Sequence, residues 1–134
     1  MATLEISNRI IIKIGSAILV DSEKGVLRED WLDSLCKEVS ELKVSGKEVT
    51  IVSSGAIALG RSRLGLQNRK LTLSEKQACA AAGQSLLTLT YEKALNKYGI
   101  TTAQALLTLN DTEDRRRWLN ARSTLDTFLL LGAV

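Results

Sequence analysis

The chain has 134 residues, of which 45% are hydrophobic and 25% charged, and its formal net charge is +3. This balance is typical of one globular domain that is large enough to bury a core, and it excludes a disordered or membrane-spanning chain. A weak positive charge permits anionic ligands but falls short of the basic character of nucleic-acid-binding domains. The sequence holds no histidine, which excludes histidine-based catalysis and histidine metal ligands within it.

The cysteines and the amino-terminal residues bear on the cellular compartment. Residues 1–8 contain no basic segment followed by an apolar one, so no secretory signal is visible. Cys36 and Cys79 are too far apart for a metal-binding pair, and both lie in helical apolar patterns. We therefore expect reduced thiols in the core of a cytoplasmic protein.

The first predicted strand is Arg9–Ile14, which contains four isoleucines and one lysine. Its continuous apolar character favours a strand that is buried on both faces of a parallel sheet. Lys13 lies near the carboxyl end of this strand, and Gly15 and Ser16 follow it. Because ligands of open α/β sheets bind beyond the carboxyl ends of the strands, Lys13 is a candidate ligand-binding residue. The alternative is a lysine that reaches solvent from the strand edge.

A parallel βαβ unit is predicted next. Asp21–Val26 is expected to be a polar connection, and Arg28–Ser45 has the periodicity of an amphipathic helix that Gly46 ends. Val49–Val52 then forms a second strand rich in β-branched residues. Strand, helix and strand in this order favour a right-handed crossover between parallel strands.

The second strand breaks at Ser53, Ser54 and Gly55 and continues as a helical run of small residues, Ala56–Leu59. Unpaired backbone amides and the positive end of the helix dipole favour an anion at such a helix start, either a carboxylate or a phosphate. Gly55 would let a ligand approach the main chain closely. The alternative is an ordinary strand-to-helix turn with a serine cap.

The basic segment Arg61–Leu73 is predicted to be a loop, either a lid or a solvated surface. Ser74 and Gln77 match a capping box that opens a long helix, which Gly99 ends. Small and apolar residues fill most of Ala78–Tyr91, which predicts either deep burial or packing against another subunit.

A third strand is predicted at Thr101–Leu107, followed by a last helix that Gly132 ends. The candidate caps of this helix are Asn110, Asp111 and Thr112. A basic triplet, Arg115–Arg117, lies in its first turns, and we interpret it as a solvated face rather than an anion site. Ala133 and Val134 are then interpreted as the first step of another strand.

Gly55–Ser62 differs at one position from the phosphate-binding pattern G-x-x-x-x-G-K-S. Here arginine replaces the lysine, and the interior Ala-Ile-Ala-Leu favours a helix, whereas that loop stays open around phosphates. No G-x-G-x-x-G pattern is present either. The sequence therefore favours neither a P-loop nor a dinucleotide-binding fold.

Several runs together resemble one family, the glutamate 5-kinases of the amino-acid kinase superfamily. They stand in the family's order and spacing: Ile11–Leu19, Ile51–Leu66, Glu75–Gln84, Ala103–Thr108 and Asp111–Leu125. The pattern K-x-G-S is shared across the superfamily. The runs SSGAIALGR and EKQACAAAGQ are much more specific to glutamate 5-kinases.

The resemblance implies an α/β fold of the amino-acid kinase type, an αβα sandwich whose mostly parallel sheet carries helices on both faces. It implies ATP-dependent phosphorylation of the γ-carboxylate of L-glutamate, the first step of proline biosynthesis, with ATP and Mg²⁺ and in a homo-oligomer. In-line phosphoryl transfer needs positioning and cationic charge more than an acid–base pair, so a site without histidine is no obstacle.

Site residues follow from the resemblance by position. Lys13 would contact the ATP phosphates as the catalytic residue, and Gly15 and Ser16 would line the phosphate path. Ser54, with the backbone of Gly55 and Ala56, would hold glutamate. No residue of the chain is assigned as a metal ligand.

In the family, the position of Val134 is followed by a strand, an Asn/Asp-rich loop with further glutamate contacts and the nucleotide-binding half. We therefore expect residues 1–134 to be the N-terminal glutamate-binding part of an amino-acid kinase domain, incomplete at its C-terminus and inactive alone.

Alternative functions stay open. The first is another amino-acid kinase, which acts on acetylglutamate or aspartate, and the second is a non-catalytic amino-acid-sensing fragment. The apolar run Ala78–Tyr91 also leaves a purely structural role between subunits open. Nucleic-acid binding is not favoured, because no aromatic residues interleave with the basic segments, and no apolar run is long enough for a membrane span.

Overall fold

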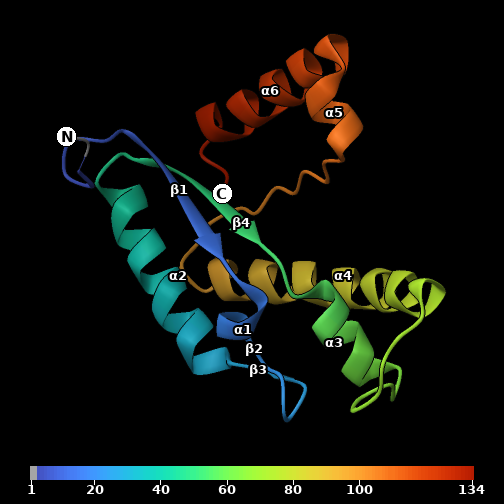
Figure 1. Cartoon of the computed structure of the whole chain (residues 1–134). Coiled ribbons are helices and arrows are strands. Elements are labelled where there is room, and N and C mark those ends of the chain that lie inside the picture. Colours follow the sequence, from blue (N-terminus) through green and yellow to red (C-terminus); the bar gives the residue numbers. More distant parts are fainter. Residues whose placement is uncertain (1–2) are drawn as a thin grey trace.

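The chain folds into helices packed around a short parallel sheet (Figure 1). This computed structural model describes residues 3–134. Met1 and Ala2, at the start of the stretch without a visible secretory signal, lie outside the described residues. The elements in chain order are β1 (Arg9–Ile14), α1 (Ser16–Leu19), β2 (Val20–Asp21), β3 (Val26–Leu27), α2 (Glu29–Val44), β4 (Glu48–Ser53), α3 (Ala56–Arg63), α4 (Leu73–Asn96), α5 (Leu109–Glu113) and α6 (Arg115–Leu130).

The sheet that positions the rest of the molecule consists of β1 and β4, which pair in parallel. Its register runs from Arg9 opposite Glu48 to Ile14 opposite Ser53. Helix α2 connects the two strands, so the predicted parallel βαβ unit is confirmed. Between them, β2 and β3 form a small antiparallel hairpin in the segment predicted to be a polar connection.

The core lies between one face of this sheet and helices α2 and α4 (Figure 1). Its fully buried members include Leu19, Val39, Val49 and Leu95. Both cysteines are buried and free, as predicted, and burial raises the pKa of the Cys36 thiol to about 11. Helix α6 lies on the other side of the sheet (Figure 1), so the predicted α/β arrangement with helices on both faces is confirmed.

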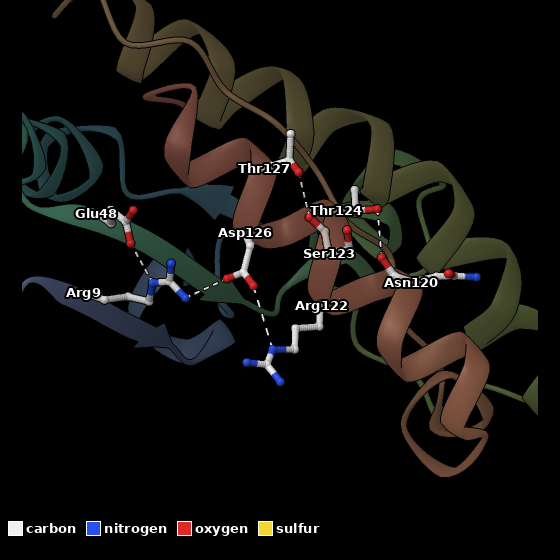
Figure 2. A network of polar contacts seen from close by, with 8 residues as sticks. All are labelled: Arg9, Glu48, Asn120, Arg122, Ser123, Thr124, Asp126 and Thr127. Carbon is white, nitrogen blue, oxygen red and sulfur yellow. Dashed lines mark hydrogen bonds and ion pairs between the residues drawn. The ribbon is translucent and has the colours of Figure 1, made fainter.

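The second face of the sheet is less covered than the sequence predicts. Ile11 is 68% exposed and Val52 is 49% exposed, and strand alternation places both on the face of Arg9 and Lys13. The expected burial of β1 on both faces is therefore wrong, because α6 leaves Ile11 and Val52 largely uncovered. The ion pair that joins α6 to this face lies at Arg9, at the start of β1. Figure 2 shows that contact: the Arg9 guanidinium bridges Glu48 at 2.7 Å and Asp126 of α6 at 2.8 Å.

The predicted third strand is also absent, since Thr101–Leu107 forms no strand within the described residues. Two backbone hydrogen bonds begin one: the Val134 amide donates to the Thr101 carbonyl at 3.0 Å, and the Ala103 amide donates to the Val134 carbonyl at 2.9 Å. This is the pattern of a parallel pair. A strand needs a partner along its length, and here Val134 supplies a single residue.

Helix α4 begins earlier than predicted. Its cap is Thr72, whose hydroxyl accepts from the Glu75 amide at 3.2 Å, while the Glu75 carboxylate accepts from the Thr72 amide at 2.8 Å. Ser74 and Gln77 therefore lie inside the helix, and the capping box assigned to them is wrong. A carboxylate at this position complements the positive helix end better than the amide of Gln77.

The predicted last helix is two helices, and its predicted caps are wrong. Thr108 caps α5 and Asp114 caps α6, where the Asp114 carboxylate accepts from the Arg117 amide at 2.9 Å. Arg115–Arg117 are exposed, as a solvated face requires. Gly132, at φ +86°, ends α6 as predicted.

Two further helices also end near a glycine with positive φ, whereas α3 ends later than predicted. Gly46 ends α2 at φ +82°, and Gly99 lies just beyond α4 at φ +70°, both as predicted. Helix α3 runs to Arg63, so the first residues of the predicted Arg61–Leu73 loop are helical. No helix among residues 3–134 combines the length and apolar character that crossing a membrane requires.

Candidate functional site

The turn between β4 and α3 lies beside the end of β1. The Ser54 amide donates to the Ile14 carbonyl at 3.2 Å, which ties the turn to the carboxyl end of that strand. Gly55 has φ +124° and ψ −2°, a conformation that residues with a Cβ rarely adopt. The two candidate regions of the sequence, around Ser16 and around Ser54, therefore meet at one edge of the sheet.

Helix α3 begins with unpaired amides. Its cap is Gly55, and no side chain caps it, so the alternative of a serine-capped turn is wrong. Among residues 3–134, the amides of Gly55, Ala56 and Ile57 donate no hydrogen bond in the network of backbone and side-chain contacts. Such amides at a helix start attract a carboxylate or a phosphate.

A cavity of about 660 Å³ opens at this turn. Its walls come from the start of α1, the β2–β3 hairpin, the end of β4, helices α3 and α4 and the loop between these two helices. The polar residues that line it are Ser16, Ser22, Ser53, Ser54, Arg61, Gln67, Asn68 and Gln84. Serine hydroxyls, amide side chains and one guanidinium are donors suited to an anionic ligand.

Arg61 supplies the positive charge of the cavity. Its Nε donates to the Leu66 carbonyl at 3.0 Å, and its Nη2 donates to the Arg69 carbonyl. Both acceptors are neutral, and within the described residues no carboxylate forms an ion pair with Arg61. The same contacts hold the loop that carries Gln67 and Asn68 against the cavity, so this segment is part of the cavity wall rather than a detached surface loop.

A buried phenol reaches the turn from the core side. The Tyr91 hydroxyl donates to Ser53 Oγ at 2.8 Å, and Tyr91 is 8% exposed. Burial raises the pKa of Tyr91, which keeps its proton available as a donor. Sequence reasoning assigned Tyr91 to the apolar stripe of α4 alone.

The predicted site residues fall into two groups. Ser16, Ser54, Gly55 and Ala56 line the one cavity. Lys13 does not line it: it lies opposite Val52 in the sheet, and its side chain is exposed. Gly15 links the two groups as the residue between β1 and α1.

The sequence places Ser53 at the break of the strand without assigning it a contact, and it gives no site role to Arg61 or Gln84. A signal existed for Gln84, which is a polar residue inside an otherwise small and apolar helical run. Arg61 was read as part of a loop, and no local pattern showed that its guanidinium would bind two carbonyls of the following loop.

Across residues 3–134, no group of three or more cysteine, aspartate or glutamate side chains gathers in a way that could hold a metal ion. The cavity also lacks a lining carboxylate. The donors that line the cavity are therefore suited to binding an anion.

Comparison with known proteins places these features in a family. Residues 8–134 match the amino acid kinase family. The chain is 56% identical over 130 residues to the glutamate 5-kinase of Caulobacter vibrioides strain NA1000, which covers 97% of this chain and 34% of that protein. It is 55% identical over 134 residues to the glutamate 5-kinase of Ruegeria sp. strain TM1040, covering 100% of this chain and 36% of the relative. The chain thus spans about a third of the length of these curated relatives.

Proposed function

This chain belongs to the amino acid kinase family, and we propose that it forms the glutamate-binding part of a glutamate 5-kinase. In this reaction a γ-carboxylate oxygen of L-glutamate attacks the terminal phosphorus of ATP and becomes bonded to it, while ADP leaves. Members of a kinase family use ATP. The assignment of glutamate as acceptor rests on relatives at 52–56% identity that carry the name glutamate 5-kinase.

The observation that carries the proposal is the amide-lined cavity at the β4–α3 turn. Its unpaired amides, at Gly55 and Ala56, and the Ser54 hydroxyl are donors for one carboxylate of glutamate. The Arg61 guanidinium, which has no carboxylate partner within the described residues, supplies a charge for an anionic ligand in the same cavity. A dicarboxylic amino acid therefore fits this site better than a neutral one.

The second part of the proposal is that Lys13 contacts the phosphates of ATP. Its exposed ammonium, near the carboxyl end of β1, is suited to an ATP phosphate that approaches the edge of the sheet, and Gly15 and Ser16 would line its path. Phosphoryl transfer proceeds largely by positioning and by neutralising the charge that develops on the phosphoryl oxygens. We assign no residue to Mg²⁺, because no group of three or more metal-ligating side chains gathers among the described residues.

The remaining parts of the proposal concern the complete enzyme. Because the chain spans about a third of its relatives, we expect binding of glutamate without phosphoryl transfer from the 134-residue chain alone. We also propose that the complete enzyme is a homo-oligomer and that it is located in the cytoplasm.

Isothermal titration of the 134-residue chain with L-glutamate tests the proposal. We expect saturable binding that weakens about tenfold in Ser54→Ala, the loss of one hydrogen bond to a charged group. Ser85→Ala, which changes an exposed serine of α4, is the matched control and should bind as the wild type does.

Titrations with N-acetylglutamate and aspartate distinguish the proposed glutamate 5-kinase from the amino-acid kinases that act on those two substrates. Tighter binding of either ligand than of glutamate would replace the proposed acceptor. A chain that is folded by circular dichroism and binds none of the three would contradict the proposal that this part holds the substrate.

A further inference from the structure

We propose that Tyr91 is a positioning residue for the glutamate-binding turn, which it fixes through Ser53. The inference rests on the proposed function, since it concerns the same cavity. Tyr91 itself does not line the cavity, whereas Ser53 does.

Two hydrogen bonds connect the core to the turn. The Tyr91 hydroxyl donates to Ser53 Oγ at 2.8 Å, and Ser53 Oγ donates to the Ser54 carbonyl at 3.3 Å. One serine hydroxyl thus accepts from the phenol and donates to the backbone, which uses its single proton and one of its lone pairs.

The second of these bonds sets the direction of an amide. The carbonyl of Ser54 and the amide of Gly55 belong to one planar trans peptide, so they point in opposite directions. Holding the carbonyl toward the Ser53 hydroxyl therefore aims the Gly55 amide away from it. This amide is one of the unpaired donors at the start of α3.

The turn needs such a restraint because of its glycine. Gly55 has φ +124°, and glycine populates several backbone regions at little cost. Rotation of the Ser54–Gly55 peptide would turn the amide away from a ligand. Each donor that must be ordered on binding weakens the affinity, whereas a preorganised donor does not.

Tyr91 is well placed to act as the restraint. Its ring is 8% exposed and belongs to the buried core cluster, so packing fixes its rotamer. One helical turn earlier, Leu87 lines the cavity, which sets this part of α4 directly behind the turn. The rigidity of the core is thereby passed to the Gly55 amide through a single serine.

The test uses Tyr91→Phe, which keeps the ring and removes the hydroxyl. Two quantities are measured on the 134-residue chain: the position of the Gly55 amide signal in a ¹H–¹⁵N NMR spectrum and the dissociation constant of L-glutamate. We expect the Gly55 signal to shift or broaden and the affinity to fall about fivefold, as for the loss of one neutral hydrogen bond.

Matched variants separate positioning from general stability. Tyr98→Phe removes the other tyrosine hydroxyl, which contacts the Asp33 carbonyl, and should change neither quantity. Ser53→Ala should reproduce both effects of Tyr91→Phe, and the double variant should add nothing further, because one chain of contacts is broken twice. Ser53→Thr, which keeps a hydroxyl, should retain wild-type affinity.

An unchanged Gly55 signal, or an unchanged affinity in a folded Tyr91→Phe chain, would overturn the inference. A wild-type chain that does not bind glutamate would instead count against the proposed function. In that case the Gly55 signal alone decides whether Tyr91 fixes the turn, since it is observed without ligand.

Discussion

Gly55 carries the tightest constraint on the site at the level of a single residue. Its φ of +124° is strained for any residue with a Cβ, so we expect Gly55→Ala to lower the free energy of unfolding by about 1–2 kcal/mol. The nearest atom to the added methyl group would be Val20 Cγ2 at 3.5 Å, an ordinary contact, so the cost comes from the backbone and not from a clash. Urea unfolding followed by circular dichroism measures it.

Gly15→Ala is the matched control for this prediction. Gly15 has φ −75° and ψ 152°, and apart from its two chain neighbours no residue among 3–134 has a heavy atom within 4 Å of an added Cβ. Its stability should stay unchanged or rise slightly, because alanine restricts the unfolded chain. Equal losses in both variants would contradict the assigned role of the Gly55 backbone.

Some residues of the site can be predicted from their neighbours in the sequence, whereas others depend on contacts between distant segments. Ser54, Gly55 and Ala56 could be predicted, because a strand that breaks on a serine–glycine step into a helix defines its own free amides. Arg61 and Tyr91 could not, since their partners, the Leu66 carbonyl and Ser53 Oγ, come close only through the packing of α3 and α4. That Lys13 lies outside the cavity could not be predicted either, because it depends on the register of the sheet.

At the level of elements, α3 and α4 approach so closely that glycine is required on both helices. A Cβ at Gly60 would lie 1.8 Å from the Cys79 carbonyl oxygen, and one at Gly83 would lie 1.7 Å from the Ala56 carbonyl oxygen. These contacts leave no room for a methyl group. Helix α3, whose first residues line the cavity, is thereby held against α4, which supplies Gln84.

We expect Gly83→Ala and Gly60→Ala each to destabilise the chain by at least about 2 kcal/mol, the upper part of the range for overpacking. Helix propensity alone predicts the opposite sign, a gain of about 1 kcal/mol for alanine. Ser85→Ala, on the exposed side of α4, is the control and should be neutral or slightly stabilising. Thermal unfolding measures all three, and a stabilised Gly83→Ala would show that the two helices are not in contact in solution.

The helices and the two main strands could be predicted from periodicity, but their boundaries and neighbours were less accessible. The predicted cap of α4 was Ser74 and the observed cap is Thr72, because the carboxylate of Glu75 is a better acceptor for a backbone amide than the side chain of Gln77. Thr101–Leu107 has the composition of a strand but pairs only with Val134. Composition describes a segment, whereas a strand also requires a partner.

At the level of the whole molecule, the two faces of the sheet are stabilised differently. One face contributes to the core with α2 and α4, whereas the other is in contact with α6, whose single buried residue is Leu129. The polar contact between α6 and the sheet is the ion pair in which Asp126 accepts from Arg9 at 2.8 Å (Figure 2). Beyond the helix, Val134 bonds to Thr101 and Ala103 and packs against the core cluster. Contacts that exposed ions make are weak and are screened by salt.

This asymmetry predicts that α6 opens more readily than the rest of the chain. In Asp126→Ala we expect faster amide hydrogen exchange across α6, with little change in α2, α4 or the global unfolding midpoint, since an exposed ion pair contributes little to global stability. High salt should speed exchange of α6 in the wild type and less so in the variant. Arg122→Ala removes an ion pair within α6, at 3.8 Å, without touching the sheet, and should leave the attachment intact. Exchange that rises equally in all helices of Asp126→Ala would mean that α6 is an integral part of the core.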